Sequence, residues 1–455
     1  MTDTGQWPLE ATASRGPQRR FKGRRRAALL LWTMSLAGCS TPATSRAVAA
    51  ENAGTRTLGR STFAESADPA DAALIGHWVS GDTEIVFAPR AEHPAGHPRV
   101  FGVIPHGPYE GVMALRHDEG EGWKGFYFRA SGLARTEVTL SQSGNDLTLA
   151  VSRTESLRLH RTGDINLPLL ARTAIVGHRG LSLGRSELMN TSAAIRHCWF
   201  FGCSGLELDV TVPHDSARRP LPDTLKVYHP PEWRSEIVGF DSVAVSAVRD
   251  APDLARALAE AGEAGMSFIY IDPKLRWLVS RDAPAARRAL TKIIAAAHAQ
   301  TSAHPGRTSI AIGAETNGVG EAGDLTVGLR LEQPWDADVA WALEVTRGTD
   351  IKRALTRAHA TAEQRPDLVS FNLLRVAGGG GGLLRLFVRT VDEDAERAFA
   401  ATRLPFIYWT AHDEGQFDGA QAAAMRADRL RDGRSAIITP YPHRLAFYLA
   451  TRPAS

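Results

Sequence analysis

The chain has 455 residues, of which 43% are hydrophobic and 23% are charged, and this composition excludes a disordered chain, a collagen and a polytopic membrane protein. The length fits two domains if one of them is an α/β barrel, because such barrels use about 250 residues. The formal net charge is +3, but residues 1–38 carry seven basic and two acidic side chains, so the remainder has a net charge of −2. No nucleic-acid-binding surface is therefore expected on the folded part.

Residues 1–38 are typical of a lipoprotein signal peptide. A basic cluster, Arg19–Arg26, precedes a largely apolar run, Ala27–Gly38, which is shorter than the roughly 20 residues that span a bilayer. The run ends in LAGC, which resembles the lipobox of bacterial lipoproteins. The resemblance implies that Cys39 is lipidated, so that the protein is exported and anchored to the bacterial cell envelope. The alternatives are an uncleaved short anchor and a chance cysteine, and the export route stays open.

The next two segments differ in their periodicity. Residues 39–68 are rich in Ala, Thr, Ser and Gly and show no apolar period, so they are predicted to be a flexible tether. Residues 69–165 have period two, with runs such as TEIVFAP, WKGFYFRA and EVTLSQ between turn residues. This pattern predicts an antiparallel β-sandwich or small β-barrel of six to eight strands. We expect an accessory domain, because its histidines show no metal-ligand spacing.

Residues 170–455 alternate apolar runs with amphipathic segments. The helical patterns include 251–264, 283–300, 390–403, 420–431 and 444–451. The eight apolar runs are TAIVGH, GLELDVTV, SFIYID, TSIAIG, AWALEV, LVSFNLL, PFIYWT and SAIITP. Continuous apolar runs are typical of strands that are buried on both faces. This part is therefore predicted to form an α/β fold of the (β/α)8 TIM-barrel type, with a doubly wound sheet as the competing topology.

Two cysteines follow the first of these runs. Cys198 and Cys203 are five residues apart, and their spacing is not that of a zinc site. In an oxidising compartment they could form a local disulfide. Two buried thiols are the equal alternative, and the sequence leaves this open.

Polar side chains lie where the first three barrel strands are expected to end. Glu207 and Asp209 are two residues apart on one strand, so they face the same side of the sheet. In a barrel the ends of all strands share one rim, which is where catalysis occurs. The polar residues that this rule brings together are His178, Arg179, Glu207, Asp209, His229, Asp272 and Lys274.

These residue types suit the cleavage of a phosphodiester. Three carboxylates would repel one another without a cation, and oxygen ligands favour Mg²⁺ or Ca²⁺ over zinc. Two histidines could accept and donate protons, and Arg179 and Lys274 could neutralise a phosphate. Each feature has an ordinary structural explanation when taken alone, because a single His usually packs in a core. Their joint position favours an enzyme.

The motifs HRG, MNTSAAI, GCSGLELDV, VYH and IDPK, in this order, resemble the glycerophosphodiester phosphodiesterase-like barrel family. That family has H-R-G, E-N-T, E-x-D, a second His and E-x-K. Met189 stands where the family has its first metal-binding Glu, and Pro440 replaces the Asp of a late T-D-x-P motif. Trp409 matches a late W-T motif and is expected in the substrate pocket.

The departure at Met189 is similar to the sphingomyelinase D-like phospholipases, which lack this Glu and carry D-x-K, the pattern of Asp272 and Lys274 here. The resemblance implies that Glu207, Asp209 and Asp272 bind Mg²⁺, with Ca²⁺ also possible. It also implies that Lys274 binds the substrate phosphate, a role we expect Arg179 to share.

The same resemblance implies that His178 and His229 are the catalytic acid/base pair. The segment between Asp209 and His229 is longer than in either group, so His214 is the alternative to His229. In these families a substrate hydroxyl attacks phosphorus, a cyclic phosphate forms and the alcohol leaves. The glycine run 378–382 could be a mobile lid over such a site or a surface loop.

The expected function is that of a metal-dependent phosphoric diester hydrolase acting on glycerophosphodiesters or on phospholipid, lysophospholipid or sphingolipid head groups at the envelope. Its expected partners are this substrate and the membrane, through the lipid anchor, with the protein itself a monomer. One alternative is a non-catalytic barrel lipoprotein that binds a lipid head group or a glycan. The other is a structural envelope lipoprotein in which the β-domain does the work. Loss of both histidines and of E-x-D would have favoured these alternatives.

Overall fold

The computed structural model describes residues 61–64, 69–90, 99–120, 122–152, 155–229, 243–315, 338–345, 365–372, 404–409, 419–427 and 436–453, with positions 325, 328, 329, 332, 335 and 356. These residues belong to one compact unit. The signal peptide with Cys39, most of the tether, the glycine run 378–382 and the predicted helix 390–403 lie outside the described residues. Among the described residues, no helix is long and apolar enough to cross a membrane.

The first folded part is a closed antiparallel barrel, which the short helix α2 (Pro69–Leu74) precedes. Each strand pairs with the next along the chain, and β1 pairs with β8. The period-two pattern predicted six to eight strands, and the structure has eight, arranged as a barrel rather than a sandwich. The strands are β1 (Gly76–Ser80), β2 (Thr83–Pro89), β3 (Val100–Ile104), β4 (Gly111–Asp118), β5 (Gly122–Arg129), β6 (Arg135–Ser143), β7 (Asp146–Ala150) and β8 (Ser156–Gly163).

The interior of the antiparallel barrel is apolar. Large side chains such as Trp78, Phe87 and Met113 fill it and are almost completely buried. Alternate residues of each strand point inward, so the period-two pattern that predicted the strands also supplied this core.

The second part is a closed barrel of eight parallel strands. The sheet runs β10-β12-β13-β14-β15-β16-β17-β9, and β9 also pairs with β10, which closes it. This closure confirms the barrel and excludes the doubly wound sheet. The short strand β11 (Lys226–Val227) joins β10 in antiparallel fashion. The barrel strands are β9 (Ala174–Gly177), β10 (Gly205–Thr211), β12 (Phe268–Pro273), β13 (Ser309–Glu315), β14 (Val339–Val345), β15 (Leu368–Asn372), β16 (Phe406–Trp409) and β17 (Ala436–Thr439).

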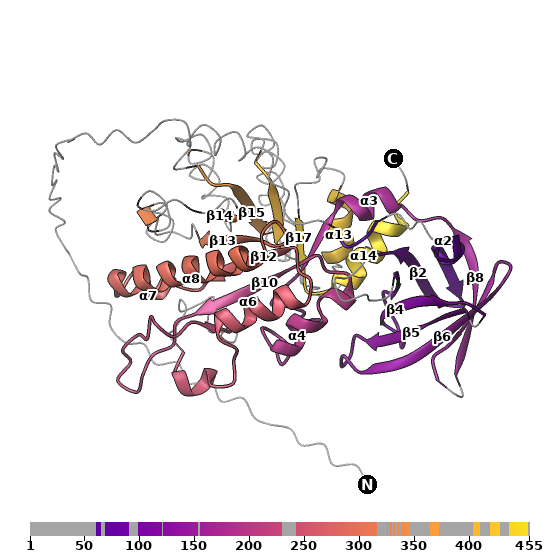
Figure 1. Cartoon of the computed structure of the whole chain (residues 1–455), viewed down its shortest axis with the longest axis horizontal. Coiled ribbons are helices and arrows are strands. Elements are labelled where there is room, and N and C mark those ends of the chain that lie inside the picture. Colours follow the sequence, from indigo (N-terminus) through magenta and orange to yellow (C-terminus); the bar gives the residue numbers. More distant parts are fainter. Residues whose placement is uncertain are drawn as a thin grey trace, which may run out of the picture. The chain divides into compact units, whose positions relative to one another are not determined.

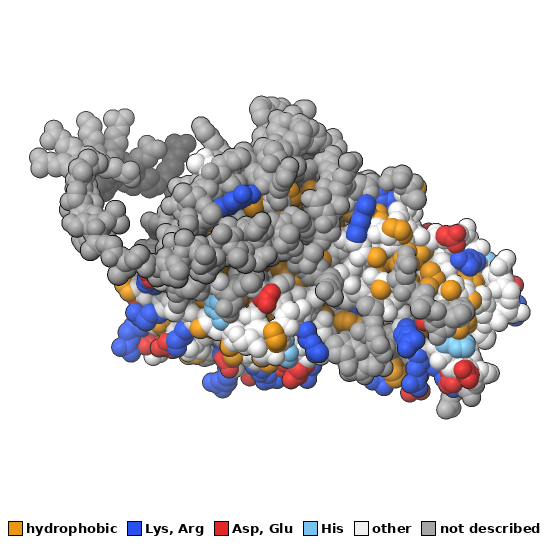
Figure 2. All heavy atoms as spheres, turned by 45° about the horizontal axis from the view of Figure 1, so that its top comes forward, with side chains coloured by type: hydrophobic (Ala, Val, Ile, Leu, Met, Phe, Trp, Pro, Cys, Tyr) orange, Lys and Arg blue, Asp and Glu red, His pale blue; other side chains and the backbone are white. Residues whose placement is uncertain are grey.

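Helices cover the parallel strands. Figure 1 shows α6 and α8 beside one another along the barrel, and both contribute to the apolar cluster that outward-facing side chains of β10 and β12 share. On the face shown in Figure 2, the acidic and basic side chains of the described residues are interspersed. The described helices are α3 (Leu167–Arg172), α4 (Ser192–His197), α6 (Leu254–Glu263), α7 (Arg276–Val279), α8 (Ala283–Ala303), α13 (Gly419–Arg426) and α14 (Pro442–Thr451), with the 3₁₀ turns η1 (Trp199–Phe201) and η2 (Val245–Val248).

The lumen of the parallel barrel changes character along its axis. Its apolar part is a separate cluster that contains many small side chains, among them Ala174, Ala311 and Ala342. Along β10 and β12 the inward-facing residues become polar toward the carboxyl ends, with Glu207 and Asp209 on one strand and Asp272 on the other. The fold thus places the polar residues at one end of the barrel.

The two barrels contact each other through helix α14 and the turn η1. Glu110, at the start of β4, accepts hydrogen bonds from His443 (2.9 Å) and Arg444 (2.8 Å) of α14. Phe101 and Val103 of β3 belong to the same apolar cluster as Phe201 of η1. The antiparallel barrel is therefore packed against the parallel barrel.

Candidate active site at the carboxyl ends of the barrel strands

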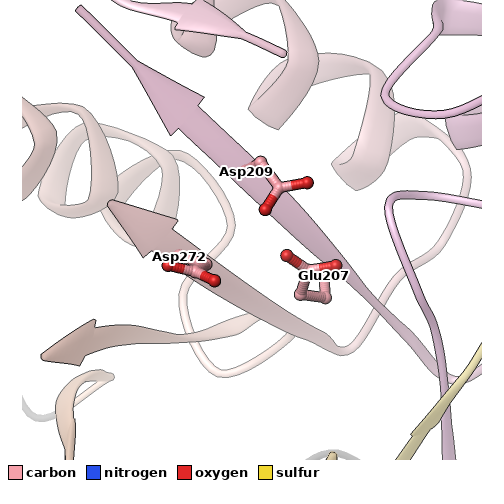
Figure 3. Close-up of side chains that lie close together, drawn as sticks. All are labelled: Glu207, Asp209 and Asp272. Carbon is pink, nitrogen blue, oxygen red and sulfur yellow. The ribbon is translucent and has the colours of Figure 1, made fainter. Parts of the chain in front are cut away.

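Three buried carboxylates converge from two neighbouring strands. Glu207 and Asp209 lie on β10, and Asp272 of β12 is the direct parallel partner of Asp209. One oxygen from each residue lies within 4.8 Å of the others, and all three residues are at most 3% exposed. Figure 3 shows the three side chains directed toward one shared space between the strands. Side chains two residues apart in a strand point to the same face, which explains why both β10 carboxylates face the lumen.

The turn after β9 places His178 and Arg179 beside these carboxylates. Arg179 adopts a positive φ of 53°, and its backbone N–H donates to Glu207 Oε2 over 2.7 Å. The next amide, that of Gly180, donates to the Glu207 backbone carbonyl at 2.8 Å. His178 is buried, and its Nε2 lies 3.8 Å from Glu207 Oε2. The turn is therefore tied to Glu207 at several points, which fixes the position of His178.

The Arg179 guanidinium connects three groups. Its Nε lies 3.3 Å from Asp209 Oδ2, and a terminal nitrogen lies 3.1 Å from His229 Nε2. The other terminal nitrogen donates to Met189 Sδ over 3.1 Å. Met189, which occupies the position of the family's missing Glu, thus lies against the site as an uncharged acceptor. Arg179, expected to bind phosphate, is paired with Asp209 in this structure.

The structure brings His229 to the site and places His214 elsewhere. His229 follows β11 and reaches Asp209 through Arg179. His214 Nδ1 lies 2.7 Å from the backbone carbonyl of its neighbour Asp215, and its backbone forms bridges with Pro220 and Ala244. Of the two alternatives for the second histidine, His229 is the one that contacts a residue of this site.

Lys274, just after β12, inserts its ammonium among the carboxylates. Its Nζ lies 3.1 Å from Asp209 Oδ1 and also bonds Asp272 Oδ2. Burial by itself would lower the pKa of Lys274, but the charges of Asp272 and Asp209 outweigh it and raise the pKa well above its ordinary value. Lys274 is therefore a permanent cation at this end of the barrel.

The carboxylates themselves titrate in opposite directions. Burial, followed by the charges of Asp209 and Asp272, raises the pKa of Glu207 well above its ordinary value. Burial would also raise the pKa of Asp209, but the charges of His229, Lys274 and Arg179 hold it far below its usual range. Glu207 thus favours its protonated form while Asp209 stays ionised, which limits the repulsion between them.

Asn190 is a functional residue whose role the sequence did not reveal. Its side-chain Nδ2 donates to Asp209 Oδ2 over 2.9 Å, and its Oδ1 accepts from the Asp209 backbone N–H over 3.3 Å. Asn190 has a positive φ of 58°, and the next residue, Thr191, caps helix α4 by accepting from the Ala194 N–H. The N-T motif matched the family, but the motif alone did not show that its Asn orients a carboxylate.

A second group that the sequence did not reveal lies on β12 and β14. Tyr270 of β12 donates its hydroxyl to Glu344 of β14 over 2.7 Å, and both side chains are buried. Gly313 of β13, between these strands, makes the room, because a Cβ there would lie 2.6 Å from Glu344 Oε1 and 2.8 Å from the Tyr270 oxygen. Burial and then the charge of Glu344 raise the pKa of Tyr270 well above its ordinary value, so it remains a donor. A single Glu in the otherwise apolar run AWALEV was the available signal.

Of the other residues singled out in the sequence, the structure describes some and leaves others outside the described residues. Trp409 ends β16, but its side chain lies outside the described residues, as Cys39 does. Pro440, where the family has Asp, follows β17, and its carbonyl accepts from the Leu183 N–H over 3.1 Å. Both cysteines after β9 are buried free thiols, so of the two alternatives, a disulfide or two thiols, the structure has two thiols.

The acidic group fits a divalent cation. Glu207 Oε1 is a buried carboxylate oxygen that has no hydrogen-bond partner among the described residues. Three carboxylates supply oxygen ligands of the type that Mg²⁺ and Ca²⁺ prefer. A cation bound by the three carboxylates would compensate their negative charge.

Comparison with known proteins gives distant likenesses only. No family model and no curated protein matches the chain. Among solved structures, a glycerophosphoryl diester phosphodiesterase domain of an uncharacterized protein from Mycobacterium tuberculosis shares 16% identity over 61% of this chain and 99% of its own, with a TM-score of 0.32. A citrate lyase from Burkholderia xenovorans LB400 shares 14% identity over 62% of this chain and 77% of its own, with a TM-score of 0.35. At these values the fold rests on the strand pairings of this chain, and neither activity is transferred to it.

Proposed function

We propose that the protein is a metal-dependent phosphoric diester hydrolase. The observation that carries the proposal is the convergence of Glu207, Asp209 and Asp272 within 4.8 Å at the end of a parallel barrel, beside two histidines. A group of three acids alone would be compatible with a simple cation site. The histidines and the Lys274 ammonium add the proton transfer and the positive charge that cleavage of a phosphodiester needs.

The motif resemblance supports the same class of substrate. The H-R-G, E-x-D and D-x-K motifs, which resemble the glycerophosphodiester phosphodiesterase-like and sphingomyelinase D-like barrels, all contribute to this one group of side chains. We propose glycerophosphodiesters and the head groups of phospholipids, lysophospholipids or sphingolipids as substrates. Mg²⁺ is the proposed cation, since all three ligands are carboxylates.

The residues of the chain divide the chemistry between them. A bound divalent cation would supply positive charge next to the phosphate. Lys274 adds a second positive charge, and Arg179 holds Asp209 in place. His178 and His229 form the acid/base pair: one accepts the proton of the attacking hydroxyl and the other protonates the leaving oxygen. The buried surroundings strengthen each of these electrostatic interactions.

Phosphorus NMR on a panel of glycerophosphodiesters, lysolipids and sphingomyelin tests this function, first with Mg²⁺ and then with excess EDTA. Conversion of at least one diester in Mg²⁺, and its loss in EDTA, is the expected result. Asp209→Asn should abolish conversion and metal binding while the protein stays folded. Asp118→Asn, which changes a half-exposed acid of β4 in the antiparallel barrel, is the matched control and should stay active.

The same panel distinguishes the non-catalytic alternative. A barrel that only binds a lipid head group or a glycan would shift the phosphorus or ligand signals without conversion. Full activity of Asp209→Asn, or full activity in EDTA, would refute the metal site itself.

We further propose that a lipid on Cys39 anchors the protein to the bacterial envelope, where such head groups are found. The support is the short apolar run that ends in LAGC. Cys39→Ser should abolish labelling of the expressed protein by a fatty-acid analogue. Unchanged labelling of this variant would disprove the anchor and leave the barrel chemistry unaffected.

A further inference from the structure

Cys198 and Cys203 are adjacent because the chain between them forms a helix-terminating turn. Gly202 has a left-handed φ of 92°, its N–H bonds the Trp199 carbonyl, and the Cys203 N–H bonds the Cys198 carbonyl over 3.3 Å. This is the Schellman hydrogen-bond pattern, in which the side chains of the two residues that flank the turn meet. Both cysteines are fully buried.

The two sulfur atoms lie directly behind the turn that carries His178. Cys198 Sγ donates to the Gly180 carbonyl over 3.3 Å. A Cβ built on Gly177 would lie 2.5 Å from Cys198 Sγ and 3.2 Å from Cys203 Sγ, so Gly177 packs against both thiols at once. The state of the sulfur atoms is thus coupled by contact to the turn of residues 177–180.

A buried cation lies beside the same two thiols. Arg90, at the end of β2, stacks its guanidinium on Trp199, 3.4 Å from the ring centroid, and donates to the Trp199 carbonyl. Its Nε and one terminal nitrogen are buried and have no hydrogen-bond partner among the described residues. Burial lowers the pKa of Arg90 to about 9, which still leaves it charged at neutral pH. Burial and then the neighbouring Cys198 raise the pKa of Cys203 well above its ordinary value, and Arg90 offsets only part of this shift.

We infer that Cys198 and Cys203 are a modification site, a dithiol that converts reversibly to an intramolecular disulfide, and that its oxidation acts on the turn that carries His178. The turn already holds the two residues together, so the bond requires little backbone movement. Arg90 offsets part of the cost of forming the buried thiolate, the species that attacks in thiol–disulfide exchange.

The reaction balances with a low-molecular-weight disulfide as the oxidant. One cysteine thiolate attacks a sulfur of this disulfide, which releases one thiol and forms a mixed disulfide. The second cysteine loses its proton and attacks the protein sulfur of the mixed disulfide, which releases the second thiol. Two electrons pass from the cysteines to the oxidant. Because both thiols are buried, the exchange takes place during folding or through local opening.

Peptide mapping tests the bond directly. The full chain is equilibrated in buffers of reduced and oxidised glutathione, quenched with acid, alkylated in denaturant and digested with trypsin. Cleavage after Arg196 and Arg218 gives one peptide, 197–218, that contains both cysteines and not Cys39. In oxidising buffer we expect this peptide to lack both alkyl groups and to be lighter by two hydrogen atoms, and to return to the dialkylated form in reducing buffer.

Single substitutions serve as controls. Cys198→Ser and Cys203→Ser should each give a peptide that carries one glutathione or one alkyl group. Arg90→Lys should oxidise at a rate near that of the native chain, while Arg90→Met, which keeps a long side chain without charge, should oxidise severalfold more slowly. A native peptide that stays dialkylated in every buffer, also after refolding in it, would overturn the proposal, as would a bond to Cys39 or to a second chain.

Hydrogen exchange tests the coupling without any assay of catalysis, so its result is separate from that of the proposed function. Oxidation removes the Cys198 thiol that donates to the Gly180 carbonyl. The amides of residues 178–182 should therefore exchange faster in the oxidised form than in the reduced form. Identical exchange in the two forms would disprove the coupling.

Discussion

The molecule contains two closed barrels of eight strands that use their interiors differently. The antiparallel barrel is filled with large apolar side chains such as Trp78 and Phe87. The parallel barrel has a mixture of small and large apolar side chains over part of its lumen and buried charges at the carboxyl ends of β9, β10 and β12. In a parallel barrel every strand ends at the same rim, whereas neighbouring antiparallel strands end at opposite rims. The parallel topology can therefore collect polar residues that follow successive strands.

The comparison of the two interiors also shows how the parallel barrel accommodates buried charge. In the parallel barrel, Glu207, Asp209 and Asp272 face Lys274 and Arg179, and Glu207 favours its protonated form. Removing one partner from such a group leaves an uncompensated buried charge, which costs about 3–5 kcal/mol. Substitutions among the buried polar groups of the parallel barrel should therefore affect chemistry, stability or both, whereas substitutions inside the antiparallel barrel should affect stability alone.

The largest expected effect is on catalysis at the parallel barrel. His178→Ala and His229→Ala should each lower the rate of diester cleavage by about 10²–10⁴-fold, because an acid or base contributes about that much. Metal binding should be retained, and the native rate should depend on pH with a bell shape. His214→Ala is the matched control and should have little effect. If His214→Ala is inactive and His229→Ala is active, the second histidine is wrongly assigned.

The next largest expected effect is a loss of stability from a substitution in the core of the antiparallel barrel. Phe87→Ala should lower the free energy of unfolding by about 3–5 kcal/mol, since it leaves a cavity at a fully buried position. The folded fraction should bind Mg²⁺ with unchanged affinity, because Phe87 belongs to a cluster that contains no site residue. Urea unfolding and calorimetric titration measure the two quantities. A loss of Mg²⁺ affinity in the folded protein would mean that the two interiors are coupled.

The same Tyr→Phe change in both barrels gives a direct contrast. Tyr270→Phe removes a donor to the buried carboxylate of Glu344 and should destabilise by about 1.5–3 kcal/mol. Tyr127→Phe removes a donor to the neutral carbonyl of Tyr109 and should cost about 0.5–1.5 kcal/mol. Urea unfolding of both variants without metal tests the difference. Equal losses would show that the Glu344 charge is compensated by other groups.

The smallest effect concerns the contact between the barrels and depends on pH. Burial lowers the pKa of His443 below its ordinary 6.5. The pKa of Glu110 also lies below its ordinary 4.5, although burial alone would raise it, because His443 and Arg444 favour its ionised form. Both groups thus bind fewer protons in the folded than in the unfolded protein, so stability should fall as the pH decreases below 6.5 and further below 4.5.

Urea unfolding between neutral and acid pH measures this loss. In His443→Gln the part of the loss that begins near pH 6.5 should disappear. His160→Gln alters an exposed His–Asp pair on β7 and β8 and should leave the pH dependence unchanged, because exposed ion pairs contribute little. If the pH dependence of stability is the same in His443→Gln as in the native chain, His443 is not the group that causes the loss near pH 6.5.

Much of the architecture could be predicted from the sequence because the relevant signals are local. The eight apolar runs correspond to β9, β10 and β12–β17, with ends that differ by one or two residues. The spacing of E-x-D was enough to place Glu207 and Asp209 on one face, since strand parity depends only on neighbouring residues. The period-two pattern did not single out β1 and β4, where Gly76 and Gly111 begin the strands and turn residues are close.

What the sequence by itself determined is thus the kind of strands, their order along the chain and the residue types at their ends. Only the tertiary structure decided which of these residues meet. Tyr270 and Glu344 are 74 positions apart, and their contact needs the curvature of the barrel and the absence of a side chain at Gly313. The Arg179 contacts with Met189 and His229 likewise depend on how two separate loops pack over β10. Local pattern sets which face of a strand a side chain occupies, but distances between loops follow from the closure of the whole sheet, which no short segment encodes.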